Sequence, residues 1–340
     1  MKPVVTFGEV MLRLSPPGHL RLLQVNSLDV TFGGAEANVA AALAQLGQPA
    51  RFVTALPDND IAQLCINQLR GLGVDTQHIQ RSGKRVGAYF VEKGASQRGS
   101  TVLYDREHSS IAEIAPESLD WPKLLENASW FHFTGITPAL SERCQTACRQ
   151  ALEAAKRLGI PTSCDLNYRK KLWSRANAQR VMSELMPNVD YCIANEEDAD
   201  DVFGIKAGST DVTSGELDHA RYESVAEQLC ERFGFKGVAI TLRESHSASE
   251  NGWSGMLYTG KKAYFSPKYH ITVIDRVGGG DSFGAGLIFA LVQGDSPERA
   301  INFAVANSCL KHTIVGDYNY VKRDEVEKLM GGDGSGRVQR

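Results

Sequence analysis

The sequence predicts an α/β protein with a doubly wound, mainly parallel sheet flanked by helices and with a small β-sheet lid. Short apolar segments alternate along the chain with longer helix-like segments, which is the pattern of repeated βαβ units. The short segments are apolar on both sides, as expected for a sheet that helices cover on both faces. Two extended segments with alternating polarity interrupt this order, and they predict a β flap that acts as a lid.

The strands and helices are expected in alternating order along the chain. Gly47 ends the first helix, since glycine readily closes a helix. Ligands of such a sheet bind beyond the carboxyl ends of its parallel strands. The expected strands are 4–12, 51–56, 129–135, 161–167, 190–195, 237–243 and 271–275, and the expected helices are 35–47, 59–73, 141–159, 175–187, 222–234 and 282–294.

We expect one domain over residues 1–330, with lid inserts at about 12–32 and 86–106, followed by a Gly-rich tail at 331–340. The lid is expected to expose apolar residues on one face, and pairing of two lids would cover that face in a homodimer. The residues expected on this face are Leu22, Leu23, Val25, Phe90 and Val91.

Composition excludes several classes of partner. The 340 residues include 37 Lys and Arg against 40 Asp and Glu, so that the net charge is −3. This balance provides no overall positive field for nucleic acid or an anionic membrane. No apolar run approaches the ~20 residues that a membrane-spanning helix needs. Seven scattered cysteines without a CxxC pair favour a cytoplasmic location.

Three consecutive glycines, Gly278, Gly279 and Gly280, join an expected strand to an expected helix. The first N–H groups of a helix attract phosphate, and glycine lets the backbone approach it closely. Asp281 follows the glycines, and its spacing fits two interpretations equally. It is either a helix N-cap that contributes ~1 kcal/mol or a general base that takes a proton from an attacking hydroxyl. Neither a Walker A loop nor a GxGxxG fingerprint is present.

The segment DRVGGGDSFGAG at 275–286 closely resembles the carboxy-terminal signature of the ribokinase-like carbohydrate kinases. TFGGAEANVAAALAQLG at 31–47 resembles the amino-terminal sugar motif of this family, and DLNYR, NEED and TLRES follow in the family's order. The resemblance implies transfer of the γ-phosphoryl group of ATP to a sugar hydroxyl with Mg²⁺. A monovalent cation such as K⁺ is a further candidate cofactor.

The resemblance assigns roles to individual residues. Asp281 corresponds to the catalytic base, and Gly278, Gly279 and Gly280 correspond to the anion hole. The matching nucleotide-side residues are Asn195, Thr241 and Arg243, with Gly278 and Gly280. Asp198 stands where the family often has a glutamate near the metal, and a Gly-rich turn usual in the family is absent after residue 241.

The substrate side resembles the 2-keto-3-deoxygluconate kinases of this family. Arginine can hold a carboxylate through two parallel hydrogen bonds, and tyrosine can pack on a sugar face. The resemblance implies ATP-dependent phosphorylation of 2-keto-3-deoxygluconate to its 6-phosphate. The corresponding substrate residues are Gly34, Asn38, Tyr89, Tyr104, Arg106, Arg169 and Asp317.

Other functions share parts of this pattern. A 5-dehydro-2-deoxygluconate kinase also binds an acid sugar, whereas a fructokinase or ribokinase does not need the arginine pair. A non-catalytic sugar-acid sensor would not need Asp281 and the glycine turn. For Asp317, an ordinary loop position is an equal alternative to a substrate contact.

Overall fold

The computed structural model describes residues 1–195, 197–206 and 219–334. Within these residues the main sheet has ten strands in the order β13-β12-β11-β10-β9-β8-β1-β4-β5, with β14 paired to β12. The strands from β11 to β5 are parallel, and β12, β13 and β14 are antiparallel. Their bounds are β1 Val4–Phe7, β4 Ala50–Leu56, β5 Ile79–Arg81, β8 Trp130–Thr134, β9 Thr162–Asp165, β10 Tyr191–Ala194, β11 Gly237–Ser245, β12 Glu250–Thr259, β13 Lys262–Phe265 and β14 Tyr269–Thr272.

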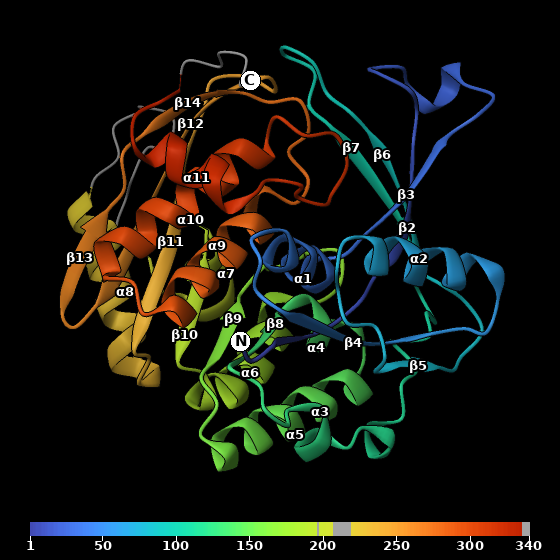
Figure 1. Ribbon diagram of the computed structural model, residues 1–340, viewed down its shortest axis with the longest axis horizontal. Helices are drawn as coiled ribbons and strands as arrows, with labels where there is room; N and C mark the ends of the chain where they lie inside the picture. Colours follow the sequence, from blue (N-terminus) through green and yellow to red (C-terminus); the bar gives the residue numbers. More distant parts are fainter. Residues whose placement is uncertain (196, 207–218, 335–340) are drawn as a thin grey trace.

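Helices cover both faces of this sheet (Figure 1). Consecutive strand residues such as Val4 and Val5 belong to different apolar clusters, one on each face. One face packs against α1 Ala35–Gln45, α2 Asp60–Gly71, α9 Gly279–Gln293, α10 Pro297–Lys311 and α11 Arg323–Met330. The other packs against α3 Trp121–Leu124, α4 Ile136–Leu140, α5 Glu142–Leu158, α6 Arg175–Leu185, α7 Asp198–Phe203 and α8 His219–Phe233. The doubly wound arrangement predicted from the sequence is therefore confirmed.

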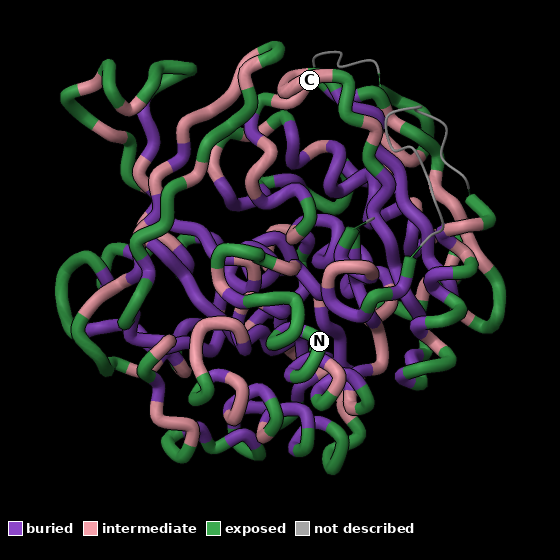
Figure 2. Tube along the Cα trace, turned by 180° about the vertical axis from the view of Figure 1, so that it is seen from behind, coloured by how far each residue is buried: buried purple, intermediate pink, exposed green. Residues whose placement is uncertain are grey.

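Helix boundaries follow local signals in the sequence. The Ser141 hydroxyl accepts a hydrogen bond from the Cys144 N–H at 3.2 Å and caps α5, which Gly159 closes in the left-handed conformation. Buried positions concentrate in the sheet and on the inner sides of the helices, as Figure 2 shows. Short 3₁₀ turns complete the connections at η1 Leu22–Gln24, η2 Pro116–Ser118 and η3 Met186–Asn188.

A separate four-stranded sheet forms the lid, in the order β3-β2-β6-β7. It projects from one side of the main body (Figure 1). Its strands are β2 Met11–Ser15, β3 Asp29–Gly33, β6 Ala88–Glu92 and β7 Thr101–Asp105. The lid predicted from the sequence is present. Residues 331–334 follow α11, and 335–340 of the predicted Gly-rich tail lie outside the described residues.

The single strand predicted for 4–12 is wrong, because the chain divides at Gly8. Val4–Phe7 pairs with β4 and β8 in the main sheet, whereas Met11–Ser15 pairs with β3 and β6 in the lid. A Cβ at Gly8 would overlap the carboxyl group of Glu36. The chain can thus pass from one sheet to the other only with glycine at this close approach.

The apolar lid face predicted from the sequence is partly wrong. Leu23 is 98% exposed, but Val91 is buried in a small cluster with Met11 and Tyr89. Neighbouring residues of a strand point to opposite faces, so Phe90 and Val91 cannot share one. Val91 therefore belongs to the face that packs toward the main domain.

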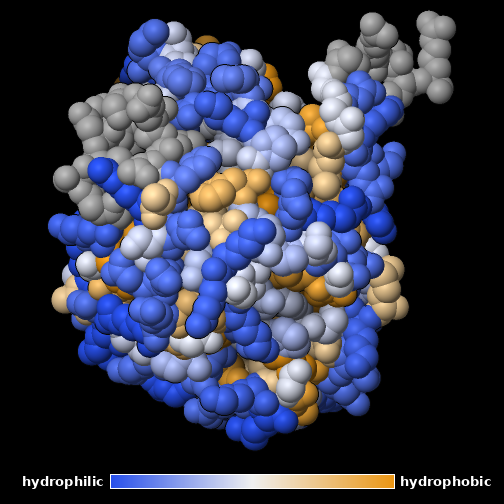
Figure 3. Space-filling view, turned by 90° about the vertical axis from the view of Figure 1, so that its left-hand side faces the viewer, coloured by the Kyte–Doolittle hydropathy of each residue, from blue (hydrophilic) through white to orange (hydrophobic). Residues whose placement is uncertain are grey.

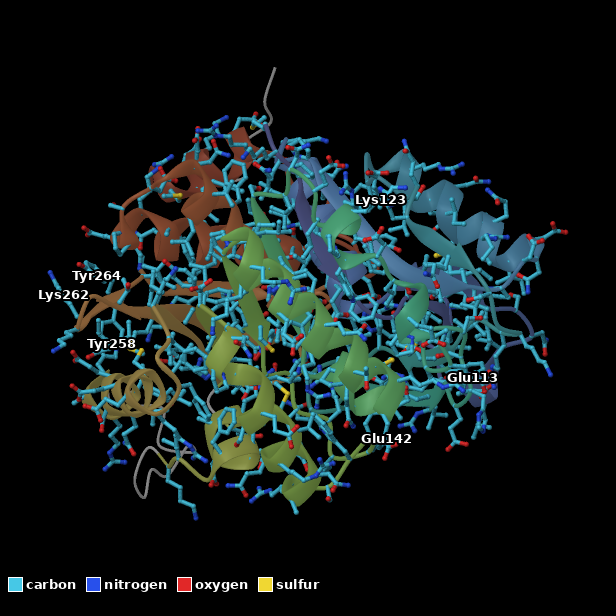
Figure 4. The ribbon with its side chains drawn as sticks, turned by 90° about the horizontal axis from the view of Figure 1, so that it is seen from below. Glu113, Lys123, Glu142, Tyr258, Lys262 and Tyr264 are labelled. Atoms are coloured by element: carbon cyan, nitrogen blue, oxygen red, sulfur yellow. The ribbon has the colours of Figure 1, made fainter. Side chains whose placement is uncertain are left out.

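The far edge of the main sheet ends at β13. The Lys262 ammonium lies 4.9 Å from the centre of the Tyr264 ring, and both residues lie at this edge with Tyr258 (Figure 4). A lysine on an edge strand opposes pairing with another chain. The side of the molecule that includes β13 and α8 is mainly hydrophilic, with small scattered apolar groups (Figure 3). Among the described residues, none of the helices has the length and apolarity to cross a bilayer.

Candidate active site

A cavity of about 460 Å³ opens between the lid and the carboxyl ends of the parallel strands. It is the place where a doubly wound sheet binds ligands. All the site residues predicted from the sequence line this cavity, except Gly279. Gly279 is buried below it, where a Cβ would overlap the His312 ring. Predicted residues that lie up to 283 positions apart in the sequence, from Gly34 to Asp317, thus share one cavity.

Helix α9 begins at the glycine turn, with Gly278 as its N-cap residue. Gly278 has a φ of 84°, and a Cβ there would overlap the Asp317 carbonyl, so the turn requires glycine. The N–H groups of Gly280 and Asp281 donate no hydrogen bond to any described residue. At Gly280, no atom lies within 4 Å of the position that a Cβ would take. The helix therefore offers open N–H groups to an anion.

Asp281 is not a helix N-cap, and this interpretation of the sequence is wrong. The helix begins at Gly279, three residues earlier than expected, so that Asp281 is its third residue. Its Oδ2 accepts a hydrogen bond from Asn38 Nδ2 at 2.7 Å. Burial raises the pKa of Asp281 to about 6, the Asn38 hydrogen bond opposes this shift, and the charge of Asp317 adds to it. Asp281 is thus a carboxylate with the pKa of a general base.

The floor of the cavity is the beginning of α1. Asn38 Oδ1 accepts a hydrogen bond from the Gly34 N–H at 3.3 Å, which turns its amide NH₂ group toward Asp281. A Cβ at Gly34 would overlap the Glu9 carbonyl oxygen. Glycine at this position therefore allows the chain after β3 to pass close to the turn after β1.

The lid supplies Tyr89, Tyr104 and Arg106. The two tyrosine rings stack at 6.1 Å, and the Arg106 guanidinium lies 5.3 Å from the centre of the Tyr104 ring. Arg106 Nε donates to Glu9 Oε2 at 2.8 Å, and its Nη2 contacts the same oxygen. Glu9 was not singled out in the sequence, where it only interrupts an apolar segment. It fixes one edge of the guanidinium and leaves the rest directed at the cavity.

Asp317 is buried and lines the cavity. Its Oδ2 accepts a hydrogen bond from the Tyr89 hydroxyl at 2.6 Å, and its Oδ1 accepts from Arg13 Nη1. Arg13 Nη2 also donates to Asp275 Oδ2 at 2.6 Å. Sequence reasoning missed Arg13. It stands between Leu12 and Leu14 in an alternating strand, and this position predicts that its side chain points to the opposite face of the sheet from the two leucines.

Arg169 lies exposed at the rim, after β9. Its Nη1 donates to the Tyr168 carbonyl at 3.3 Å, and it forms no ion pair with the part of the chain that the structure describes. Its positive charge acts to lower the pKa of Asp281. The second predicted arginine is therefore placed to meet an anion that enters the cavity.

The same cavity is lined by Asn195, Asp198, Thr241 and Arg243. Asp198 accepts hydrogen bonds from the Tyr168 and Asn195 N–H groups, at 3.1 and 3.0 Å, so both of its oxygens are engaged. Burial raises the pKa of Asp198. A metal ion held here would share an oxygen with the backbone.

A second carboxyl group, that of Asp165 at the end of β9, also lines the cavity. Sequence reasoning missed it, although it opens the DLNYR segment. Burial, with the charges of Asp198 and Asp281, raises the pKa of Asp165 well above its usual value. A divalent cation at this place would relieve that repulsion. Among the described residues, no three His, Cys, Asp or Glu side chains converge on one point, so such an ion would need phosphate and water oxygens.

The remaining wall contains Asn251, Trp253, Arg276 and His312. The Trp253 and His312 rings lie 4.9 Å apart. Burial lowers the pKa of His312 to about 4, so its ring is neutral. No local pattern in the sequence distinguishes these residues, since β12, the turn and α10 each supply part of this wall.

The chain is similar in sequence and in structure to several known proteins. The sequence profile of the family described as "pfkB family carbohydrate kinase" matches residues 1–322. A 2-dehydro-3-deoxygalactonokinase from Haloferax volcanii is 34% identical over 98% of both chains, and a 2-dehydro-3-deoxygluconokinase from Thermoproteus tenax is 28% identical over 97% of this chain and 94% of its own. The crystal structure of a 2-dehydro-3-deoxygluconokinase from Thermotoga maritima is 49% identical, covers 98% of this chain and 100% of that one, and superimposes with a TM-score of 0.94. This chain belongs to the PfkB family of carbohydrate kinases.

Proposed function

We propose that the protein transfers the γ-phosphoryl group of ATP to a hydroxyl of a sugar acid, with 2-keto-3-deoxygluconate as the substrate and its 6-phosphate as the product. One arrangement carries this proposal. Asp281 and the open N–H groups of α9 lie at one place in the cavity, and the cavity also presents Arg106 and Arg169. A sugar that places its carboxylate at the arginines would direct its other end toward Asp281.

In the reaction, the Asp281 carboxylate takes the proton of the attacking hydroxyl. The sugar oxygen forms a bond to the γ-phosphorus, and the bond from that phosphorus to the oxygen of the ADP leaving group breaks. The N–H groups of Gly280 and Asp281 hold the anionic oxygens of the phosphate, since these donors have no other partner among the described residues. Mg²⁺, when bound with ATP, would supply positive charge to the transferred phosphate. The cavity residues that would hold it are Asp165, Asn195 and Asp198.

Charge favours an acid sugar over a neutral one. Glu9 compensates the charge of Arg106 but leaves its Nη1 without a hydrogen bond to the described residues. Arg169 at the rim adds a positive charge that Glu9 does not compensate. A neutral sugar such as fructose or ribose would leave the Nη1 of Arg106 without a hydrogen bond and Arg169 without an ion-pair partner among the described residues. Two other acid sugars remain candidates: 5-dehydro-2-deoxygluconate, and 2-keto-3-deoxygalactonate, for which the 34% identical relative is named.

An ADP-release assay over these sugars tests the proposal. The wild-type protein should turn over 2-keto-3-deoxygluconate fastest, and Asp281→Asn should lower kcat at least ~100-fold with little loss of ATP binding. Asp295→Asn, at the far end of α9, is the matched control and should keep full activity. ATP binding without turnover on any sugar would instead favour a non-catalytic sensor.

The lid supports a further part of the proposal, a homodimer. Leu14 pairs with Val30 and with Phe90, and Phe90 pairs with Leu103, so that these four form one row across the lid. Val30 is 47% and Leu103 49% exposed. The lid of a second copy is the occupant that would cover this row.

We also retain the cytoplasmic location, because all seven cysteines are free thiols.

A further inference from the structure

A buried lysine lies directly behind the glycine turn. Lys311, the last residue of α10, is 0% exposed. Its Nζ donates to the Ile314 carbonyl at 3.2 Å, and its Cε lies 3.2 Å from the position that a Cβ on Gly278 would take. A buried ammonium group is costly unless negative charge lies near it.

That negative charge comes from Asp275 and Asp317, both 3% exposed. Arg13 joins the two carboxylates, with one guanidinium nitrogen on each. Their other contacts are neutral donors: the Val277 and Gly316 N–H groups on Asp275, and the Tyr89 hydroxyl on Asp317. Arg13 therefore compensates only one of the two negative charges.

Lys311 supplies the second positive charge. Burial lowers the pKa of Lys311, and the charges of Asp275 and Asp317 act in the opposite direction. With both cations in place, the cluster of Arg13, Lys311, Asp275 and Asp317 is neutral. Without Lys311, one uncompensated negative charge would lie behind the turn and repel the phosphate in front of it.

We propose that Lys311 is a built-in cation of the phosphate site, which positions the glycine turn and makes the kinase independent of a monovalent metal ion. A potassium ion needs several oxygen ligands, commonly backbone carbonyls, in place of its hydration shell. Behind this turn, Arg13 already engages the Asp275 and Asp317 carboxylates, and Lys311 engages the Ile314 carbonyl. These residues thus do not fit a bound K⁺. The proposal rests on the proposed role of the turn as the phosphate site.

The first test uses the wild-type enzyme with 2-keto-3-deoxygluconate and MgATP, in potassium and in tetramethylammonium buffers of equal ionic strength. Equal rates in the two buffers are expected. Activity in potassium alone would overturn the inference but leave the kinase function intact, whereas no activity in either buffer would count against the proposed function.

The second test removes the ammonium group. Lys311→Ala should lower kcat at least ~10-fold, with a smaller change in the sugar KM, because the donors that hold the phosphate lose their support. Ammonium or potassium ions should restore part of the activity, and tetramethylammonium, which is too large for the vacated space, should not. Lys156→Ala on α5 removes one exposed positive charge far from the cavity and should behave as wild type.

Two outcomes would overturn the proposal: full activity of Lys311→Ala, or a loss that no monovalent cation restores, which would assign Lys311 to packing alone. Lys311→Met keeps most of the aliphatic volume and serves if the alanine variant fails to fold, as judged by circular dichroism.

Discussion

The hydrogen bond from Asn38 to Asp281 makes the pH dependence of the reaction predictable. Replacing Asn38 with alanine removes the 2.7 Å bond that favours the ionised carboxylate. A hydrogen bond to a charged group is worth ~1.5–3 kcal/mol, and one pKa unit corresponds to about 1.4 kcal/mol. The pKa of Asp281, about 6 in the wild type, should therefore rise by about 1–2 units in Asn38→Ala.

The sign follows from the role of Asp281 as a base. A base must be ionised, so activity is present above its pKa and is lost as the pH falls through it. The acid limb of kcat/KM should lie near pH 6 in the wild type and shift toward higher pH in Asn38→Ala. At pH values above the acid limbs of both proteins, any remaining difference in kcat/KM between the wild type and Asn38→Ala would report only the sugar contacts of Asn38 itself.

Kcat/KM measured by coupled ADP release across the pH range, with saturating MgATP, locates both limbs. Asn67→Ala, which removes an exposed amide on α2, should leave the limb in place. A variant at Asn38 that loses activity equally at every pH, with its limb unmoved, would refute the assignment of Asp281 as the titrating base.

Substitutions in the glycine turn and in the lid separate activity from folding and assembly. Gly280→Val should fold, because its Cβ meets no protein atom within 4 Å, yet lose at least ~100-fold in kcat; an active, folded variant would argue against the anion hole. Asp281→Asn should melt at a higher temperature at pH 7, because a pKa raised from 3.8 to about 6 means that the ionised group destabilises the fold. This gain should shrink as the pH falls from 6 to 4, and no gain at pH 7 would argue against the raised pKa. Leu103→Glu should convert a dimer into a monomer by light scattering, and a monomeric wild type would contradict the proposed lid pairing.

The parts of the fold that sequence predicts well depend on local signals. Examples are the glycine turn, the helix that Gly159 closes and the alternation of apolar segments. Each of these features is specified by residues that lie close together in the sequence. The exact start of α9 was missed because three glycines do not show which of them is the N-cap. The break at Gly8 was missed because only strand pairing reveals it. The strand before Gly8 pairs within the main sheet, and the strand after it pairs within the lid.

The charged partners inside the site could not be predicted in the same way. Arg13 and Asp317 lie 304 positions apart, and Arg106 and Glu9 lie 97 apart. The family resemblance identified Arg106 and Asp317. The pairing of each with a buried partner, however, depends on how the lid packs against the main sheet. Lys311, at the end of an ordinary helix, carries no local sign of its burial.

The central claim is that this kinase recognises the carboxylate of its sugar. The most direct measurement is kcat/KM for 2-keto-3-deoxygluconate and for fructose, in the wild type and in Arg169→Ala. A charge-assisted contact is worth ~1.5–3 kcal/mol, so the variant should lose roughly 10–100-fold on the acid sugar and change little on fructose. Arg175→Ala, an exposed arginine paired with Asp201, is the control and should preserve the wild-type ratio. A wild type that prefers fructose or ribose, or an Arg169→Ala variant that loses both sugars equally, would contradict the claim.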